Sequence, residues 1–161
     1  MAVKFSDATY KQFAEVLTHY PNKRAALLPT LWLAQQSFGY LSLAAMEYVA
    51  KLLELSPAYV AAVASFYTMF NKEPVGQFHV QVCTNLSCSL RGAEAIVTCI
   101  EKKLGIGLGQ TTTDKAFTLS EVECLGSCGT APVAQINDDY YENLTPEGVV
   151  QLIDQLAQEA E

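Results

Sequence analysis

Two closely spaced pairs of cysteines form the clearest chemical pattern in this sequence. Cys83 and Cys88 have four residues between them, and Cys124 and Cys128 have three, about forty residues further along the chain. Four thiolates held by two loops are a soft ligand set, which favours an iron–sulfur cluster and, less strongly, a zinc ion. The pattern therefore points to electron transfer rather than to bond-making chemistry.

Other uses of the cysteines fit the spacing less well. Structural zinc sites usually carry cysteine pairs separated by two residues, or they include histidine. Here both spacings are wider, and His19 and His79 lie away from the pairs in the sequence. A thioredoxin-type redox enzyme would need C-x-x-C, which is absent. Zinc, reversible disulfide chemistry and inert thiols remain as alternatives to iron and sulfide.

Residues near the pairs suggest how a cluster would be surrounded. Gly126 and Gly129 allow a close backbone approach and positive φ angles in the second cysteine loop. Ser87 and Ser127 could add hydroxyl donors. The fifth cysteine, Cys99, stands among apolar residues at helical spacing, so we interpret it as a buried, inert thiol.

Composition excludes several classes of function. The chain has 161 residues, half of them hydrophobic, and a net charge of −7. An acidic chain without a basic cluster is a poor binder of nucleic acid and of anionic lipid. The most apolar stretch, 59–70, is too short to span a bilayer. Residues 1–7 show no leader pattern, so we expect a cytoplasmic protein or a mature form whose leader has been removed.

A nucleotide site is not expected on this chain. The glycines between Gly105 and Gly109 resemble a dinucleotide fingerprint, but the position that would need its last glycine holds Gln110. The stretch also follows a predicted helix rather than a strand, so we interpret it as a helix stop and a turn. No P-loop motif is present.

Residues 1–74 are predicted to be helical. Ser6, Ser42 and the pair Ser56-Pro57 provide helix starts, and Gly39 provides a stop. Pro29 should kink the second helix or restart it, and the helix after Ser56 should run into the aromatic stretch that ends at residue 70.

The periodicity changes from helical to alternating after residues 71–76, where we place a domain boundary, so that the second domain covers 75–161. Strands are expected over 78–82, 117–122, 131–136 and 140–141, a hairpin turn over 137–139, and helices over 91–104 and from 146 onward. Both cysteine pairs would then lie in loops that follow strands. The predicted fold class is α+β, a small helical bundle followed by a helix-flanked sheet.

The motifs together resemble a known family. Cys83-x4-Cys88, the string Glu123-Cys-Leu-Gly-Ser-Cys128 and the following Ala131-Pro-Val133 are closely similar to those of the thioredoxin-like [2Fe–2S] ferredoxin subunits of respiratory NADH:quinone oxidoreductase, complex I. Upstream, Arg24-x4-Pro29 and Val63-Ala-Ser-Phe-Tyr67 match the helical region of those subunits. The resemblance covers nearly the whole chain.

The resemblance implies a cofactor, a fold and a partner. Cys83, Cys88, Cys124 and Cys128 would ligate one [2Fe–2S] cluster, and residues 75–161 would form a thioredoxin-like ferredoxin domain. The partner would be the larger flavoprotein subunit, which carries FMN and a [4Fe–4S] cluster and binds NADH. The cluster would exchange single electrons with that FMN, and the chain would not be active alone. Residues 1–74 would bind the partner.

Related holoenzymes use the same type of subunit. NAD-linked formate dehydrogenases and NAD-reducing hydrogenases are the alternatives within the family, and a zinc-stabilised adaptor without a redox role is the alternative outside it. The family further implies contacts with other peripheral-arm subunits, and a place on the cytoplasmic side of a bacterial inner membrane without direct insertion. For a processed form it implies the mitochondrial matrix.

Overall fold

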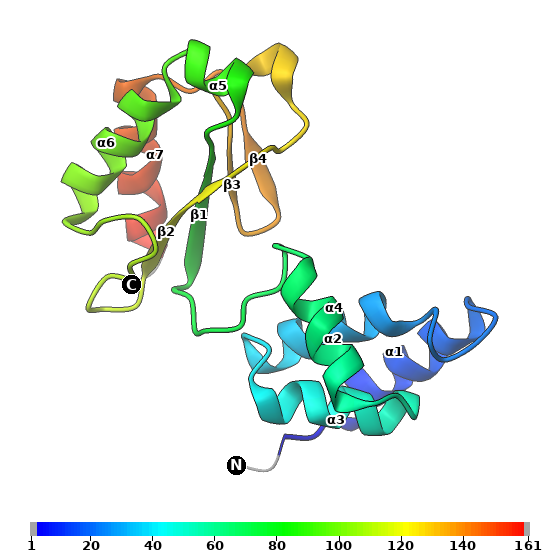
Figure 1. Ribbon diagram of the computed structural model, residues 1–161. Helices are drawn as coiled ribbons and strands as arrows, with labels where there is room; N and C mark the ends of the chain where they lie inside the picture. Colours follow the sequence, from blue (N-terminus) through cyan, green and yellow to red (C-terminus); the bar gives the residue numbers. More distant parts are fainter. Residues whose placement is uncertain (1–2, 160–161) are drawn as a thin grey trace. The chain divides into compact units, whose positions relative to one another are not determined.

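The computed structural model describes residues 3–159, which divide into two compact units between Pro74 and Val75. The first unit is built of helices and the second of a sheet with helices beside it (Figure 1). Each unit buries its own hydrophobic core. The predicted α+β class, with a helical bundle before a helix-flanked sheet, is confirmed.

The helical unit begins its helices where the sequence places capping hydroxyls. Its helices are α1 (Asp7–Thr18), α2 (Leu27–Phe38), α3 (Leu43–Leu53) and α4 (Pro57–Phe66). The side-chain oxygens of Ser6, Ser42 and Ser56 each accept a hydrogen bond from the backbone N–H three residues later. These bonds satisfy donors that lack a partner inside the helix.

Two expectations for this unit are wrong. Pro29 neither kinks nor restarts α2, because it lies in the first turn, where backbone N–H groups have no intrahelical acceptor to lose. The helix α4 ends at Phe66 rather than continuing to Phe70, because the Gln35 side chain holds the following segment in another conformation. The Gln35 amide donates to the Met69 carbonyl at 3.0 Å and accepts from the Asn71 N–H at 2.6 Å.

The second unit is a mixed sheet in the strand order β2-β1-β3-β4. The central strand β1 pairs in parallel with β2 and antiparallel with β3, and β3 forms a hairpin with β4. The elements are β1 (Phe78–Cys83), α5 (Leu86–Leu90), α6 (Ala93–Leu104), β2 (Phe117–Val122), the short 3₁₀ helix η1 (Cys128–Thr130), β3 (Ala134–Ile136), β4 (Asp139–Tyr141) and α7 (Pro146–Glu159).

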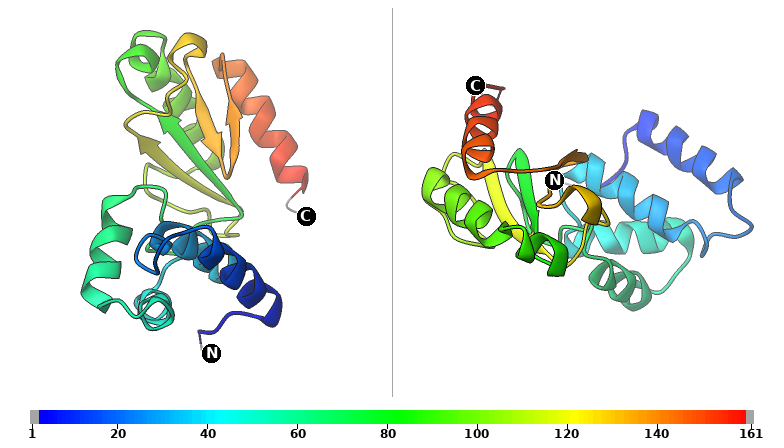
Figure 2. Two further views of the ribbon diagram at one scale, coloured as in Figure 1. Left: turned by 90° about the vertical axis from the view of Figure 1, so that its right-hand side faces the viewer. Right: turned by 90° about the horizontal axis from the view of Figure 1, so that it is seen from above.

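The two faces of the sheet differ in chemistry. The long helices α6 and α7 pack against each other beside one face (Figure 2), and Val80 and Val82 are fully buried in the core there. His79 alternates with them along β1 and was expected to be exposed. It is instead half-buried, because its Nε2 lies 2.9 Å from the Ser120 Oγ of the neighbouring strand. Burial lowers the pKa of His79, so the ring is neutral at physiological pH.

Within residues 3–159, no single helix is long and apolar enough to cross a membrane. The consecutive helices α3 and α4 meet that length and hydropathy requirement only when they are taken together, and they are bent by 119° at the break between them.

Gly76 precedes the central strand, where the chain passes very close to β2. A Cβ atom at this position would lie 2.8 Å from the Phe117 carbonyl carbon and 2.9 Å from the Phe117 nitrogen. The Gly76 N–H also donates to the Thr118 Oγ1 at 2.7 Å. Only glycine therefore fits here without moving the backbone of β2.

We predict that Gly76→Ala lowers the free energy of unfolding by about 1–3 kcal/mol, because the added methyl group overpacks against backbone that cannot move freely. Urea denaturation of the purified chain measures the change. Gly107→Ala is the matched control, because its Cβ would meet nothing closer than 3.7 Å. An unchanged midpoint for Gly76→Ala would contradict the close approach.

Candidate metal centre

The topology of the sheet brings the two cysteine segments to one edge. Cys83 is the last residue of β1, and it lies opposite Val122, the last residue of the parallel strand β2. The segments that follow both strands therefore leave the sheet at the same end, as Figure 1 shows for α5 and for the loop after β2. The carboxyl ends of parallel strands are a common place for ligand sites.

The first cysteine pair is buried. Cys83 and Cys88 are 3% and 2% exposed, and both belong to a small apolar cluster at this edge. The segment was expected to be a loop, but Leu86–Leu90 forms the short helix α5. Asn85 begins this helix, because its side chain accepts from the Leu86 N–H at 2.7 Å. The helix turns Cys88 inward against Cys83.

The second pair is more open to solvent. Cys124 and Cys128 are both exposed, and they lie in the loop that follows β2, with Cys128 opening the 3₁₀ helix η1. The Gly126 N–H donates to the Cys124 sulfur at 3.3 Å, and Gly126 has a φ of +77°. The positive φ expected of Gly126 is confirmed, whereas Gly129 does not have one.

The surroundings suit a soft, negatively charged group. Beside the buried pair lie the apolar side chains of Ala93, Ala131 and Val133, with Val122 and Leu125 packed against them. Such packing limits water access, and the Gly126 N–H shows that this loop can donate to sulfur. All five cysteines of the chain are free thiols. The donor set therefore fits an iron–sulfur cluster in its chemistry.

Burial raises the pKa of the Cys88 thiol. Its hydrogen bond with Cys83 raises the pKa further, and the nearby Cys83 and Cys128 thiols would repel the charge of a thiolate, while the backbone of Val133 partly opposes the rise. Metal ligands are thiolates, so a metal that binds here has to displace the Cys88 proton.

The structure does not itself assemble a complete ligand set. Across residues 3–159, no group of three or more His, Cys, Asp or Glu side chains is close enough to hold one metal ion. A [2Fe–2S] core divides its four thiolates between two irons, so it needs two pairs rather than one tight group. Ligation by all four cysteines therefore stays a prediction.

The remaining candidate residues lie elsewhere. Cys99 is half-buried at the edge of the main core, so its burial is less complete than expected. His19 ends α1 in the helical unit, and His79 bonds to Ser120 on the sheet. The stretch after α6 is the predicted helix stop, with Gly105 as the cap in a left-handed conformation.

Hydroxyl and carboxylate side chains hold the second cysteine loop, and of these the sequence singled out Ser127 alone, as a possible donor, without indicating Glu142 as its acceptor. Ser127 and Thr130 donate hydrogen bonds to the carboxylate of Glu142, which follows β4. The Tyr140 hydroxyl donates to the Leu125 carbonyl at 3.0 Å. No local signal marks these contacts, because the hairpin register alone brings residues 140–142 beside the loop.

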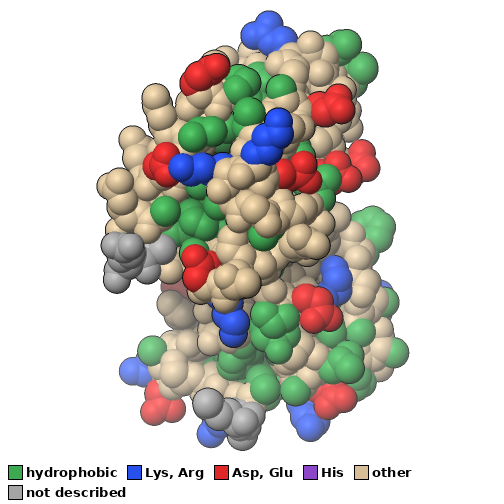
Figure 3. Space-filling model, turned by 90° about the vertical axis from the view of Figure 1, so that its left-hand side faces the viewer, with side chains coloured by type: hydrophobic (Ala, Val, Ile, Leu, Met, Phe, Trp, Pro, Cys, Tyr) green, Lys and Arg blue, Asp and Glu red, His purple; other side chains and the backbone are tan. Residues whose placement is uncertain are grey.

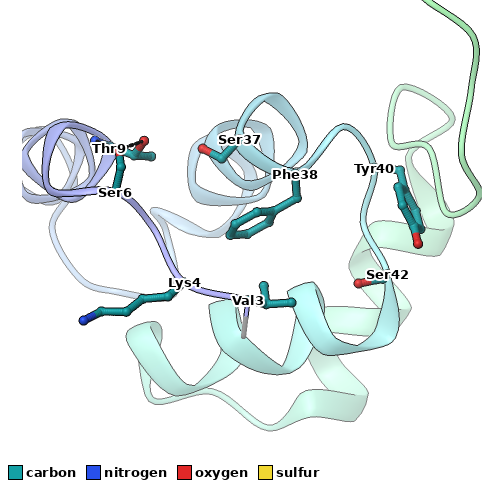
Figure 4. A pocket seen from close by; sticks show the side chains of 8 residues that line it. All are labelled: Val3, Lys4, Ser6, Thr9, Ser37, Phe38, Tyr40 and Ser42. Carbon is teal, nitrogen blue, oxygen red and sulfur yellow. Dashed lines mark hydrogen bonds between the residues drawn. The ribbon is translucent and has the colours of Figure 1, made fainter. Parts of the chain in front are cut away.

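A pocket in the helical unit lies apart from this chemistry. It is lined by small hydroxyl and apolar side chains, and Figure 4 shows the Lys4 side chain extending away from the Phe38 ring. Its lining residues are Val3, Lys4, Ser6, Thr9, Ser37, Phe38, Tyr40 and Ser42. It contains no cysteine, and we assign it no role.

Comparison with known proteins shows which family the chain is similar to. A family model described as thioredoxin-like [2Fe-2S] ferredoxin matches residues 13–157. A Rickettsia conorii protein, named as a subunit of NADH-quinone oxidoreductase, is 52% identical over 145 residues, or 88% of this chain and 87% of that protein. A Rhizobium meliloti protein, also named as a subunit of NADH-quinone oxidoreductase, is 50% identical over 125 residues, or 78% and 74%.

A solved structure is similar in fold. The NAD+-reducing [NiFe]-hydrogenase in the H2-reduced state aligns with a TM-score of 0.70 and 24% identity, over 80% of this chain and 22% of that chain. The present chain therefore spans about a fifth of the hydrogenase chain that it matches. At this identity the similarity concerns the fold alone.

We predict that replacing Cys83, Cys88, Cys124 or Cys128 by alanine abolishes or strongly destabilises a bound [2Fe–2S] cluster, because one iron loses a ligand. Visible and EPR spectra of the reconstituted chain measure this. Cys99→Ala is the matched control and should keep the cluster spectrum unchanged. Retention of the cluster in Cys124→Ala together with its loss in Cys99→Ala would overturn the assignment.

Proposed function

This chain belongs to the thioredoxin-like [2Fe–2S] ferredoxin family, and on that premise we propose that it is an electron-transfer subunit of an NADH:quinone oxidoreductase. The family membership also establishes the thioredoxin-like fold of the second unit. The observation that carries the proposal is the arrival of both cysteine pairs at the carboxyl edge of the parallel strands β1 and β2. The names of the relatives support the choice of holoenzyme.

The residues of the chain would bind and shield the cofactor. Cys83 and Cys88 would supply two thiolates from the apolar side, and Cys124 and Cys128 would supply two from the open side. The N–H of Gly126 would donate to a ligand sulfur, as it does to Cys124 in the structure. When bound, the [2Fe–2S] cluster supplies one-electron redox chemistry.

The electron partner would be the larger flavoprotein subunit. In this proposal the partner binds NADH and carries FMN and a [4Fe–4S] cluster, and the present chain exchanges single electrons with that FMN. The chain would contact other peripheral-arm subunits through the complex. It would lie on the cytoplasmic side of a bacterial inner membrane, or in the mitochondrial matrix for a processed form.

A related holoenzyme is the second candidate. The fold is similar to part of an NAD+-reducing hydrogenase, so a place in such a hydrogenase is compatible with the fold, and an NAD-linked formate dehydrogenase is the further alternative that the family resemblance implies. We favour the quinone oxidoreductase, because relatives with that name are about half identical over most of the chain. Copurification of the native complex, followed by assays with quinone, formate and H2, separates these candidates.

We predict that the purified chain is brown, contains about two irons and two labile sulfides, as one binuclear cluster requires, and does not oxidise NADH with an artificial acceptor. NADH oxidation needs a flavin and a nucleotide site, which we place on the partner. Absorbance, metal analysis and a ferricyanide assay measure these properties. A colourless protein with one zinc would support the zinc-stabilised adaptor instead. NADH oxidation by the chain alone would contradict the placement of the flavin and nucleotide sites on the partner subunit.

The helical unit exposes large apolar side chains near its end. Phe66, Tyr67 and Met69 are 79%, 39% and 48% exposed. Aromatic and methionine side chains are enriched in protein interfaces, and exposed groups of them often mark a binding surface. On the face drawn in Figure 3, charged side chains of both signs are interspersed with green apolar ones. The exposure of Phe66, Tyr67 and Met69 supports a partner-binding role for residues 1–74.

We predict that deleting residues 1–74 leaves a folded, coloured ferredoxin domain that binds the flavoprotein subunit poorly. The sheet unit has its own core and all four predicted ligands, so its cluster should survive. Losing several interface aromatics costs more than about 2 kcal/mol, so the dissociation constant should rise at least about thirtyfold. Calorimetric titration measures it, and unchanged affinity would place the interface around the cysteine loops.

A further inference from the structure

The carboxylate of Glu142 is tied to the second cysteine loop by two side chains. The Ser127 hydroxyl donates to Glu142 Oε1, and so does the Thr130 hydroxyl, at 2.6 Å. The Ser127 and Thr130 hydroxyls also lie 2.7 Å from each other. Ser127 directly precedes the predicted ligand Cys128. The carboxylate therefore holds the loop at the residue next to that ligand.

Backbone contacts from the same segment reinforce this attachment. The Asn143 N–H donates to the Thr130 carbonyl at 2.7 Å, and the Leu144 N–H donates to the Pro132 carbonyl at 3.0 Å. Tyr140 reaches the other half of the loop through its hydrogen bond to the Leu125 carbonyl. Residues 140–144 therefore contact the cysteine loop along its length, from Leu125 to Pro132.

Glu142 carries a negative charge that no ion pair neutralises within residues 3–159. The ion pairs described there join Lys23 to Glu54 and Lys103 to Asp154. The hydrogen bonds from Ser127 and Thr130 lower the pKa of the exposed Glu142 carboxyl. Glu142 is therefore ionised at physiological pH, and its charge stays close to the loop that carries Cys124 and Cys128.

We propose that Glu142 is a positioning residue for Cys124 and Cys128, and that its carboxylate lowers the reduction potential of the cluster held by those ligands. The inference rests on the proposed function, because it assumes a cluster at this loop. It assigns a role to a residue outside the cysteine motifs, which neither the spacing of the cysteines nor the neighbouring sequence indicates.

The two parts of this role have separate physical causes. Hydrogen bonds donated to a charged acceptor hold a loop more firmly than those donated to a neutral one, so removing the carboxylate should loosen the segment between Leu125 and Thr130. Reduction adds one negative charge to the cluster, and a fixed anion nearby disfavours the reduced state. Glu142→Gln separates these causes, because an amide oxygen still accepts hydrogen bonds but carries no charge.

Hydrogen exchange on the full-length chain without cluster tests the positioning. In Glu142→Ala, the amides of residues 125–130 should exchange about fivefold faster, as expected for losing a net hydrogen bond of typical strength. Glu142→Gln should speed exchange in the same segment less than Glu142→Ala does, because its neutral amide oxygen still accepts hydrogen bonds. Asp139→Asn is the matched control, since Asp139 is an exposed carboxylate on β4 without a described hydrogen bond to the loop.

Redox titration of the reconstituted full-length chain, followed by EPR, tests the charge. Glu142→Gln should bind the cluster with an unchanged spectrum and titrate at a higher potential than the wild type. Glu142→Ala should show the same upward shift and should lose its cluster faster to an iron chelator. Asp139→Asn should show a smaller shift than Glu142→Gln and an unchanged rate of cluster loss.

Each outcome decides part of the inference. Unchanged exchange in Glu142→Ala would overturn the positioning, and an unchanged or lowered potential in Glu142→Gln would overturn the charge effect. If Asp139→Asn shifts the reduction potential as far as Glu142→Gln, the shift follows from the overall charge of the chain, and the specific effect proposed for the Glu142 carboxylate is wrong. A wild-type chain that takes up no iron and sulfide would refute the proposed function and the charge effect, while the exchange measurement would still decide the positioning.

Discussion

Parallel pairing between β1 and β2 brings the ends of both strands to the same edge of the sheet, and the candidate site depends on this pairing. The register sets Cys83 opposite Val122, so that segments about forty residues apart in sequence leave the sheet side by side. An antiparallel pair would send one of these segments to the other end. The backbone bond from the Cys83 N–H to the Val133 carbonyl adds a third segment, which follows the second cysteine loop.

The two halves of the site differ in how firmly the chain holds them. The first cysteine pair is buried, with Cys83 on the central strand and Cys88 on a short helix capped by Asn85. The second pair lies on an exposed loop, whose shape depends on polar contacts with the hairpin. A site of this kind has a preformed apolar side and a side that solvent and a partner can reach, which suits exchange of electrons across an interface.

The two units have different proposed roles, cluster ligation and partner binding. The sheet unit contains all four predicted ligands, whereas the helical unit contains a pocket without cysteines and an exposed aromatic end around Phe66. Each has a separate hydrophobic core. The predicted ligands and the proposed binding surface therefore lie on different units, so neither feature needs to constrain the sequence of the other.

Local sequence determined those features that depend on near neighbours. Capping serines predicted where α1, α3 and α4 begin, Gly39 predicted where α2 ends, and alternating residues predicted β1 and β2, because caps and periodicity act over a few residues. The spacing within each cysteine pair is also a local feature, and it indicated an iron–sulfur ligand set. The family motifs extended that interpretation to a fold and a partner.

Tertiary structure decided what depends on distant segments. The end of α4 follows from a bond to Gln35 on another helix, and the half-burial of His79 follows from its pairing with Ser120. The sequence did not predict the short helix α5, because a five-residue helix has too few residues to give a periodic hydrophobic pattern. The contact of Glu142 with Ser127 needs the hairpin register and the position of the loop after β2 together. Sequence therefore named the candidate ligands, whereas only the folded chain brought the two cysteine segments to one edge of the sheet and supplied the carboxylate beside the second segment.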